Sequence, residues 1–343
     1  MTISVQPLLS KDFRCGCPGD TYHTILERRG LCYTPFPMPH PTDKLSNFLA
    51  PRYWGIWLVV AVFWLFTRLP YRIMLDVGAT LALLASKLSP KNAALMNRNL
   101  ELCFPNLSIA ERQRIGKDCW KAHGMGAMET VYLCWGNLYK LKNRLEVKGL
   151  EHLQESLKTG RGIMLLSAHM TSLDLGGFMC STVVSPVSTT AKHQRNPLVD
   201  CLINRARYRY LKYVLFAEDL KRVNQLLKEG SVIFFAFDQD YGTKGSVFAP
   251  FFGVPTATTT TVARIAKSTN SIAIPAFLVR LPKGRYLLEF QPPLTNYPSE
   301  DPVADATQYN AAIENIVRRY PDQYGWTYKR FSTRPENEPA RYS

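Results

Sequence analysis

His169 and Asp174 carry side chains that could transfer a proton, and they stand five positions apart just after a short apolar run. The run, Ile163–Leu166, predicts a buried strand, and a helix is expected to begin shortly after the histidine. Such a turn places a side chain at the carboxyl edge of a sheet, where open α/β folds bind ligands. If the carboxylate contacts one imidazole nitrogen, the other nitrogen can take a proton from a hydroxyl, as acyl transfer to an alcohol requires. The alternative is that Asp174 only caps the helix and His169 is a polar loop residue.

A second polar cluster, residues 192–200, follows another expected strand and contains Lys192 and Asn196. Asn196 precedes a proline, which is typical of a helix start, and the helix carries Arg207 among several other basic residues. Arginines two positions apart do not share a helix face, so we expect one or two of them to bind an anion. The alternative is a solvated basic helix.

A third cluster comprises Asp238, Asp240, Tyr241 and Gly242, directly after the most apolar strand, residues 231–238. Polar side chains that emerge beside a core indicate a binding site. Asp238 and Asp240 could contribute to a Mg²⁺ site, but nothing else in the sequence supplies further ligands. We therefore expect no metal and no cofactor.

The elements that would position these clusters alternate along the chain between apolar strand-like runs and helical patterns. This alternation predicts an α/β fold with a mainly parallel central sheet flanked by helices. A helix is expected over residues 256–268, with a run of threonines at its start. A capping-box pattern at Ser108 and Glu111 predicts the start of another helix. The expected strands are residues 145–148, 163–167, 187–191, 213–217, 231–238, 272–279 and 285–291.

The amino-terminal part of the chain indicates contact with a membrane. Residues 53–66 are uncharged, apolar on all sides and rich in tryptophan, which settles at the level of lipid headgroups. This run is shorter than the roughly 17–25 residues that usually span a bilayer. It therefore either spans the bilayer with the flanking arginine side chains extended toward the headgroups, or lies in the membrane interface. The alternative is a buried helix of a soluble core. The expected organisation is an irregular extension over residues 1–50, a membrane-anchoring helical segment over 51–90, the α/β domain over 91–335 and a tail over 336–343.

The charge of the chain points to an acidic partner. Lysine and arginine number 42 against 27 acidic residues, which gives a formal net charge of +15. Nucleic acid is excluded as the expected partner because no zinc-finger, RNA-binding or basic-zipper pattern is present. The 8 cysteines show no metal-binding spacing, and we interpret them as reduced thiols in a cytoplasmic compartment.

These clusters, in this order, resemble the late acyltransferases of lipid A biosynthesis, a family within the lysophospholipid acyltransferase superfamily. The resemblance covers residues 52–335. It rests on His169 and Asp174 together with PRYWGIW at 51–57, NLELCFP at 99–105, Asn196-Pro197 with Asp200, DQDYG at 238–242, SVFAPFFGVP at 246–255 and QYGWTYKRF at 323–331. Two positions depart from the family pattern: many members have Glu in place of Asp174, and Lys192 stands where an arginine is usual.

The resemblance implies an enzyme at the cytoplasmic face of the bacterial inner membrane. It implies transfer of a fatty acyl chain from acyl carrier protein to a hydroxyl of an acyl chain on a lipid A precursor. His169 would be the general base and Asp174 its orienting partner. The phosphorylated sugar would be bound by Lys192, Asn196, Arg207 and the loop from Asp238 through Asp240 and Tyr241 to Gly242.

No serine or cysteine stands in a nucleophile elbow, so the hydroxyl is expected to attack the thioester directly. The amides that open the helix after His169 are the expected donors to the oxyanion. Two other readings stay open from the sequence. One is an O-acyltransferase that uses acyl-CoA and acts on a lysophospholipid or glycolipid. The other is a catalytically idle lipid-binding membrane protein.

Overall fold

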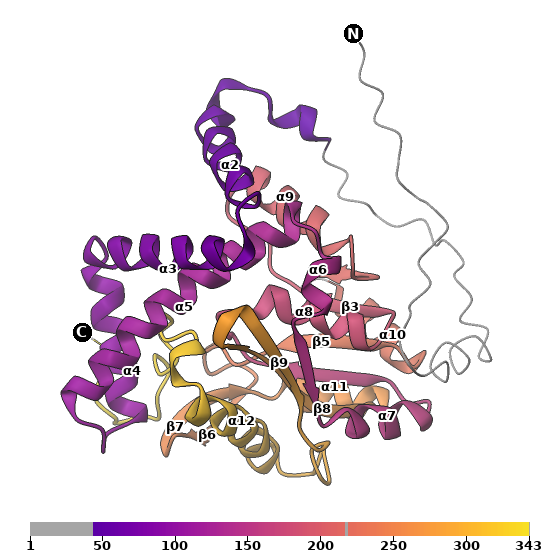
Figure 1. The fold of residues 1–343 in the computed structure, drawn as a ribbon. Helices are drawn as coiled ribbons and strands as arrows, with labels where there is room; N and C mark the ends of the chain where they lie inside the picture. The colour runs from indigo at the N-terminus through magenta and orange to yellow at the C-terminus, as the bar shows by residue number, and fades with distance from the viewer. Residues whose placement is uncertain (1–43, 217–218, 343) are drawn as a thin grey trace. The chain divides into compact units, whose positions relative to one another are not determined.

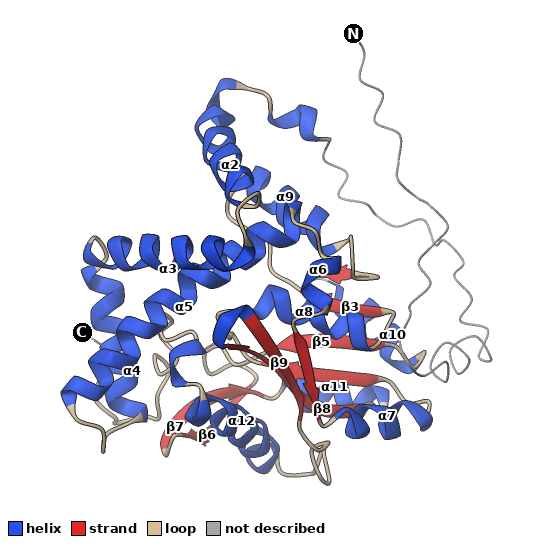
Figure 2. Ribbon diagram, viewed as in Figure 1, coloured by secondary structure: helices blue, strands red, loops and turns tan. Residues whose placement is uncertain are grey.

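The computed structural model describes residues 44–216 and 219–342. Most of the irregular extension predicted over residues 1–50 therefore lies outside the described residues. The described chain is an α/β structure with helices on both sides of a central sheet (Figures 1 and 2). The fold class predicted from the sequence is confirmed in this respect.

The central sheet has seven strands in the order β1-β9-β8-β2-β5-β3-β4. All neighbouring pairs are parallel except β8 with β9, which is antiparallel. Strand β2 lies at the middle of the sheet, and all five of its residues are buried, as expected of a strand that is covered on both faces. The strands are β1 (Leu145–Lys148), β2 (Ile163–Ser167), β3 (Val187–Thr190), β4 (Val214–Leu215), β5 (Val232–Ala236), β8 (Ile272–Leu281) and β9 (Arg285–Phe290).

Most of the helices connect these strands or cover them. Helix α8 packs on one face, where Leu175 and Phe178 join a core cluster with Leu165 and Phe234 of the sheet. Figure 1 shows α11 and α12 on the opposite side of the sheet from α8. These helices are α6 (Tyr139–Lys142), α7 (Leu150–Lys158), α8 (Leu173–Val183), α9 (Pro197–Arg207), α10 (Leu220–Lys228), α11 (Thr261–Thr269) and α12 (Pro302–Arg319).

A separate two-stranded hairpin precedes α11 and corrects one expectation. Strands β6 (Ser246–Phe251) and β7 (Val254–Thr259) pair in antiparallel register, so the helix begins at Thr261 and not at Thr256. The turn between them contains Phe252 and Gly253, both at positive φ. β-branched threonines favour extended backbone, and here they have a partner strand, which explains why the helix assignment for residues 256–260 is wrong.

From residue 44 onward, the amino-terminal part contains the α-helices α2 (Trp54–Phe66), α3 (Tyr71–Lys87), α4 (Pro90–Cys103) and α5 (Ile109–Trp135). The capping box predicted at the start of α5 is present, because Ser108 and Glu111 exchange side-chain and backbone hydrogen bonds. No residue of α2 is buried. Within residues 44–216 and 219–342, no single helix has both the length and the composition of a membrane span; α3 and α4 reach them only jointly, across a bend of 100°.

Candidate active site

The register of two central strands brings His169 and Asp238 together. Ser167, the last residue of β2, pairs with Ala236, the last residue of β5. His169 and Asp238 each follow two residues later, so both emerge at the same point of the carboxyl edge. This is the edge at which parallel sheets bind ligands.

Asp238 contacts His169 through both its backbone and its ring. The amide of His169 donates to Oδ1 and Oδ2 of Asp238, each at 3.0 Å, and Nδ1 of the ring lies 2.6 Å from Oδ1. The Asp238 side chain is only 2% exposed, whereas that of His169 is 36% exposed. One edge of the imidazole is therefore fixed against a buried carboxylate, while the ring as a whole is accessible to a substrate.

Two tyrosines hold this pair in place. The hydroxyl of Tyr324 donates to Oδ2 of Asp238 at 2.9 Å. The hydroxyl of Tyr309 donates to the carbonyl of Ser167 at 2.6 Å and accepts from the amide of Phe237 at 3.2 Å, so it joins the ends of β2 and β5. Both tyrosine side chains are buried. The geometry of the pair is thus set by packed groups from α12 and from the carboxyl-terminal segment.

The two ionisable groups stabilise one another's charged forms. Burial raises the pKa of Asp238, but the charge of His169 and its hydrogen bonds outweigh burial and hold that pKa below its ordinary value. For His169, burial acts to lower the pKa, and the charge of Asp238 and its hydrogen bond outweigh burial and raise the pKa above its ordinary value. The imidazolium form, which a general base reaches after taking a proton, is therefore stabilised in this position.

Asp174 has other partners than the expected one. Its Oδ1 accepts from Nε of Arg207 at 3.1 Å and from Nη2 at 2.7 Å, and its Oδ2 lies 3.4 Å from the Thr130 hydroxyl. Asp174 is the second residue of α8, and its side chain points toward α5 and α9, which carry Thr130 and Arg207. The carboxylate that contacts His169 in this structure is that of Asp238, and the predicted pairing of His169 with Asp174 is not present.

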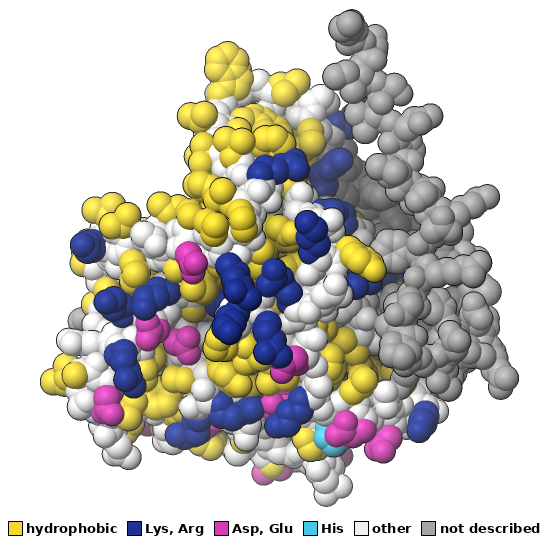
Figure 3. Space-filling view, in the orientation of Figure 1, with side chains coloured by type: hydrophobic (Ala, Val, Ile, Leu, Met, Phe, Trp, Pro, Cys, Tyr) yellow, Lys and Arg dark blue, Asp and Glu magenta, His cyan; other side chains and the backbone are white. Residues whose placement is uncertain are grey.

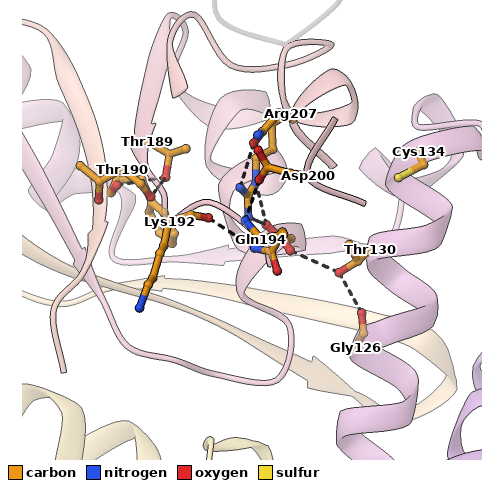
Figure 4. A network of polar contacts seen from close by, with 12 residues as sticks. Gly126, Thr130, Cys134, Thr189, Thr190, Lys192, Gln194, Asp200 and Arg207 are labelled. Atoms are coloured by element: carbon orange, nitrogen blue, oxygen red, sulfur yellow. Dashed lines mark hydrogen bonds and ion pairs between the residues drawn. The ribbon is translucent and has the colours of Figure 1, made fainter. Parts of the chain in front are cut away.

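The Asp174–Arg207 pair lines a small cavity at the carboxyl edge of the sheet. Its volume is about 40 Å³, and its wall includes Gly177, Thr189 and Phe234. The charge of Asp174 and its hydrogen bonds raise the pKa of Arg207, although burial acts in the opposite direction. Arg207 therefore stays charged at the edge of the sheet. Figure 4 shows Arg207 beside the segment that contains Gln194 and Asp200, with Thr130 on the neighbouring helix.

The other two residues of the second cluster have different surroundings. The side chain of Asn196 caps α9, because it accepts from the amides of Leu198 and Val199. Lys192 is exposed, and its side chain extends away from Arg207 in Figure 4. The structure thus brings Arg207 to the carboxyl edge of the sheet, gives Asn196 a role in starting a helix, and leaves Lys192 at the surface.

The loop after Asp238 is held mainly by the carboxylate of Asp240. Asp240 accepts from the amides of Gly242 and Thr333, at 2.9 Å and 2.6 Å, so its carboxylate fixes the loop to the carboxyl-terminal segment. Gly242 has a φ of 83°, which a residue with a side chain rarely adopts. Tyr241 is half-exposed, and burial raises its pKa to about 12, so its hydroxyl stays protonated at neutral pH. Among the described residues, no group of three or more His, Cys, Asp or Glu side chains is placed to hold a metal ion.

The amides expected to stabilise an oxyanion are largely occupied. The amide of Met170 donates to the carbonyl of Ala168, that of Thr171 to Gln323, and that of Leu173 to Met170. The turn after the strand uses two of these donors internally, and the carboxyl-terminal segment accepts from the third. The expectation that these amides form a free oxyanion site is therefore not supported at these three positions.

Several residues that organise the site were not identified from the sequence as site residues. Gln323 exchanges two hydrogen bonds with the backbone of Arg280 and accepts from the Thr171 amide. Asn99 donates to the carbonyls of Trp326 and Tyr328, at 2.7 Å and 2.8 Å, and so fixes the same segment from α4. The clustered aromatic residues at 323–331 were a signal of this role, but nothing in their spacing indicates that they reach the His169 loop.

Comparison with known proteins identifies the family of this chain. The sequence profile of the bacterial lipid A biosynthesis acyltransferases matches residues 42–333. The chain is 36% identical to the lipid A biosynthesis lauroyltransferase of Escherichia coli over 87% of this chain and 97% of the relative. It is 33% identical to the E. coli palmitoleoyltransferase of lipid A biosynthesis, over 88% and 99%, and 26% identical to the E. coli myristoyltransferase, over 87% and 93%.

The match to the family profile covers the whole described sheet, the His169 loop and most of the carboxyl-terminal segment that holds it. The relatives are covered almost from end to end. The chain is an acyltransferase and belongs to the family of bacterial lipid A biosynthesis acyltransferases.

Proposed function

We propose that this enzyme transfers a fatty acyl chain from acyl carrier protein to a hydroxyl of an acyl chain on a lipid A precursor. The observation that carries the proposal is the fixed pair of His169 and Asp238 at the catalytic edge of the sheet, in a chain of this family. The relatives are named for the transfer of lauroyl and palmitoleoyl groups in lipid A biosynthesis. A lipid A precursor is accordingly the acceptor that best fits the chain.

His169 acts as the general base in the proposed mechanism. Its Nδ1 donates to Asp238, so the lone pair of Nε2 is available to accept the proton of the acceptor hydroxyl. The hydroxyl oxygen attacks the thioester carbonyl carbon, the carbon–sulfur bond breaks, and the imidazolium returns its proton to the departing thiolate. Asp238 fixes the tautomer and stabilises the positive ring, which is the role of the carboxylate in a base dyad.

Asp174 contributes through Arg207 in this proposal. An arginine held by two contacts to one carboxylate has a fixed direction and keeps its charge. Its planar fork suits phosphate, and both the phosphorylated precursor and the phosphopantetheine arm of the carrier supply phosphate. We therefore assign Arg207 to the binding of an anionic part of a substrate at the mouth of the site, with Asp174 as its positioning residue.

The net charge of +15 supports acidic substrates, because acyl carrier protein and phosphorylated lipid A are both acidic. We propose that the enzyme works at the cytoplasmic face of the bacterial inner membrane, where both would meet.

Helix α2 exposes the side chains of Trp54, Leu58 and Leu65, which are 65%, 69% and 56% exposed. At a rise of about 1.5 Å per residue, its 13 residues extend roughly 20 Å, less than the thickness of a hydrocarbon core of about 30 Å. The helix therefore fits an interfacial anchor.

The proposal is tested with purified protein, an acyl carrier protein loaded with a fatty acid, and a lipid A precursor dispersed in detergent. Mass spectrometry of the precursor should show a mass increase of one acyl group. His169→Ala should reduce the rate by at least about 10³-fold, because the base is lost while substrate binding remains. Transfer by wild type from acyl-CoA to a lysophospholipid, with none to the precursor, would contradict the proposal, as would a His169→Ala variant with unchanged rate.

A further inference from the structure

A group of cations lies where α3 begins and where β8 turns into β9. Arg72, the second residue of α3, donates from Nε to the carbonyl of Lys283 at 2.9 Å. The guanidinium of Arg144 donates to the carbonyl of Gly284 at 3.3 Å and lies 5.0 Å from the centre of the Tyr71 ring. These contacts bring three elements together at one surface. We define the basic patch as Arg72, Arg144, Lys283 and Arg285.

Most of the contacts within the basic patch leave its charge uncompensated. Arg72 and Arg144 contact carbonyl oxygens and an aromatic ring, which position a guanidinium but carry no negative charge. Arg285 pairs with Glu146, and Asp76 stands one helical turn after Arg72. Lys283 is exposed. The patch therefore remains positive after its acidic neighbours are counted.

The basic patch adjoins an exposed apolar surface. Leu69 and Ile73 flank the start of α3 and are 37% and 49% exposed, next to Arg72. Arg68 lies over the ring of Trp64, at 4.4 Å from its centre, where α2 ends. Figure 3 shows lysine and arginine side chains gathered beside the apolar surface of α2. A border of cations beside an apolar face matches the layering of a membrane, in which phosphates border the hydrocarbon.

We propose that the basic patch binds the anionic headgroups of membrane phospholipids and so orients the catalytic edge relative to the bilayer. The inference rests on the proposed function to the extent that α2 contacts the membrane. Continuity with the apolar face favours a lipid surface over an acidic protein, because a protein partner would need to cover both surfaces at once. In this arrangement α2 supplies apolar burial, and the patch selects membranes that carry negative charge.

Vesicle sedimentation of the full-length protein tests the proposal. Wild type is compared on vesicles of phosphatidylcholine alone and on vesicles in which about a third is phosphatidylglycerol, with no lipid A precursor present. The variant is Arg72→Gln with Lys283→Gln, which removes two charges of the patch. Its matched control is Lys158→Gln with Lys228→Gln, which removes the same number of positive charges at exposed lysines that end α7 and α10.

The patch variant should partition roughly 25-fold more weakly than wild type onto the anionic vesicles, at about fivefold for each cation removed. Its partition onto neutral vesicles should equal that of wild type, and the difference should shrink at high salt. Circular dichroism and thermal unfolding establish that each variant is folded; the single variant Lys283→Gln, which leaves the Arg72 side chain in place, should show the fivefold loss alone.

Equal loss in the patch variant and the control would overturn the proposal, because net charge would then explain binding. Unchanged binding to anionic vesicles with a raised KM for acyl carrier protein would also overturn it and would assign the patch to that protein. Acyl transfer in detergent micelles reports separately on the proposed function. A wild type that is inactive in micelles would contradict that function without altering the vesicle comparison.

Discussion

Asp238 accepts hydrogen bonds from both the amide and the ring of His169, although the two residues are 69 positions apart in the chain. The contact depends on the parallel pairing of β2 with β5, which ends at the same level on both strands. As a consequence, Nδ1 of His169 is engaged in a hydrogen bond to Asp238, and the pKa of the imidazole lies above its ordinary value. The first two predictions depend on this pairing of His169 with Asp238.

The pH dependence of kcat/KM should show an acid limb above the ordinary histidine pKa of about 6.5, because the base must be neutral and its pKa is raised. Below that limb His169 is protonated and cannot accept a proton. Asp238→Asn removes the negative charge that raises the pKa, so the limb should move to lower pH while the maximum rate falls. Rates measured from pH 5 to pH 9, about two units on either side of neutrality, give the limb directly. A limb that stays in place in Asp238→Asn would show that another group titrates.

Asp238→Asn and Asp174→Asn should differ in their effect on turnover. The first should reduce kcat by on the order of 10³–10⁴, because an amide does not hold the correct tautomer or stabilise the imidazolium. The second should mainly raise the KM of the anionic substrate, since Asp174 contacts Arg207. Asp174→Glu should retain more activity than Asp174→Asn, because the carboxylate is kept. Equal losses of kcat in the two asparagine variants would indicate that Asp174 turns toward His169 when substrate is bound.

The sequence was sufficient for most of the fold because apolar runs and helix signals are local. All seven strands of the main sheet were located to within a few residues, and the capping box at Ser108 starts α5 as predicted. The hairpin β6–β7 was missed because threonine-rich segments suit a strand only when a partner strand is present.

The partner of His169 was harder to predict than the fold. Sequence spacing favours Asp174, which is near in the chain, over Asp238, which becomes adjacent only through strand register. Asp238 was recognised as a polar residue after a core strand, but its role was assigned to substrate binding. Tyr324 was quoted in a motif without a role, because nothing local shows that it reaches Asp238.

A buried ion pair joins α5 to β8, and removing only one of its partners should strongly destabilise the protein. Glu129 accepts from Nε and Nη2 of Arg280, at 2.6 Å and 2.8 Å, and from the hydroxyl of Tyr286. The side chains of Glu129 and Arg280 are 1% and 7% exposed. Glu129→Ala should lower the free energy of unfolding by about 3–5 kcal/mol, because it leaves a buried guanidinium without its carboxylate.

Denaturant unfolding measures this effect, with Glu300→Ala as the control. Glu300 pairs with Lys267 at the surface, where solvent screens the interaction, so that variant should unfold like wild type. The double variant Glu129→Ala with Arg280→Met should be less destabilised than Glu129→Ala alone, since no buried charge is left. A Glu129→Ala protein as stable as wild type would mean that water reaches Arg280.

Contact of α2 with the membrane can be tested without disturbing the fold. Deletion of residues 1–70 should release the protein from the membrane pellet, but it also removes Phe48 and Tyr53, which are buried against α9. Replacing Leu58 and Leu65 with glutamate changes only exposed positions of the same helix. This variant should sediment less with phosphatidylcholine vesicles than wild type does, because its apolar face is interrupted. Equal sedimentation would show that α2 is not the main anchor.

Gly126 of α5 should be required for the position of the His169 loop. A Cβ at this residue would lie 1.9 Å from the carbonyl oxygen of Thr171, which is two residues after the histidine. Since real Cβ contacts are essentially never shorter than 3.0 Å, Gly126→Ala must displace either the helix or the loop by about an ångström. We expect kcat to fall by about 10²-fold, which is the loss that misplacement of this size produces. The midpoint of thermal unfolding should fall as well.

Gly116 offers the matched control, because it lies on the same helix and a Cβ there would make ordinary contacts, the nearest at 3.5 Å to Met96. Gly116→Ala should keep kcat and raise the free energy of unfolding by about 0.5–1 kcal/mol, since alanine loses less backbone entropy in a helix. Steady-state rates and unfolding curves of the two variants, measured side by side, separate a local displacement of the His169 loop from a general effect on α5. If Gly126→Ala kept wild-type kcat, the loop would tolerate displacement, and the fixed geometry of His169 and Asp238 would not be what limits the rate.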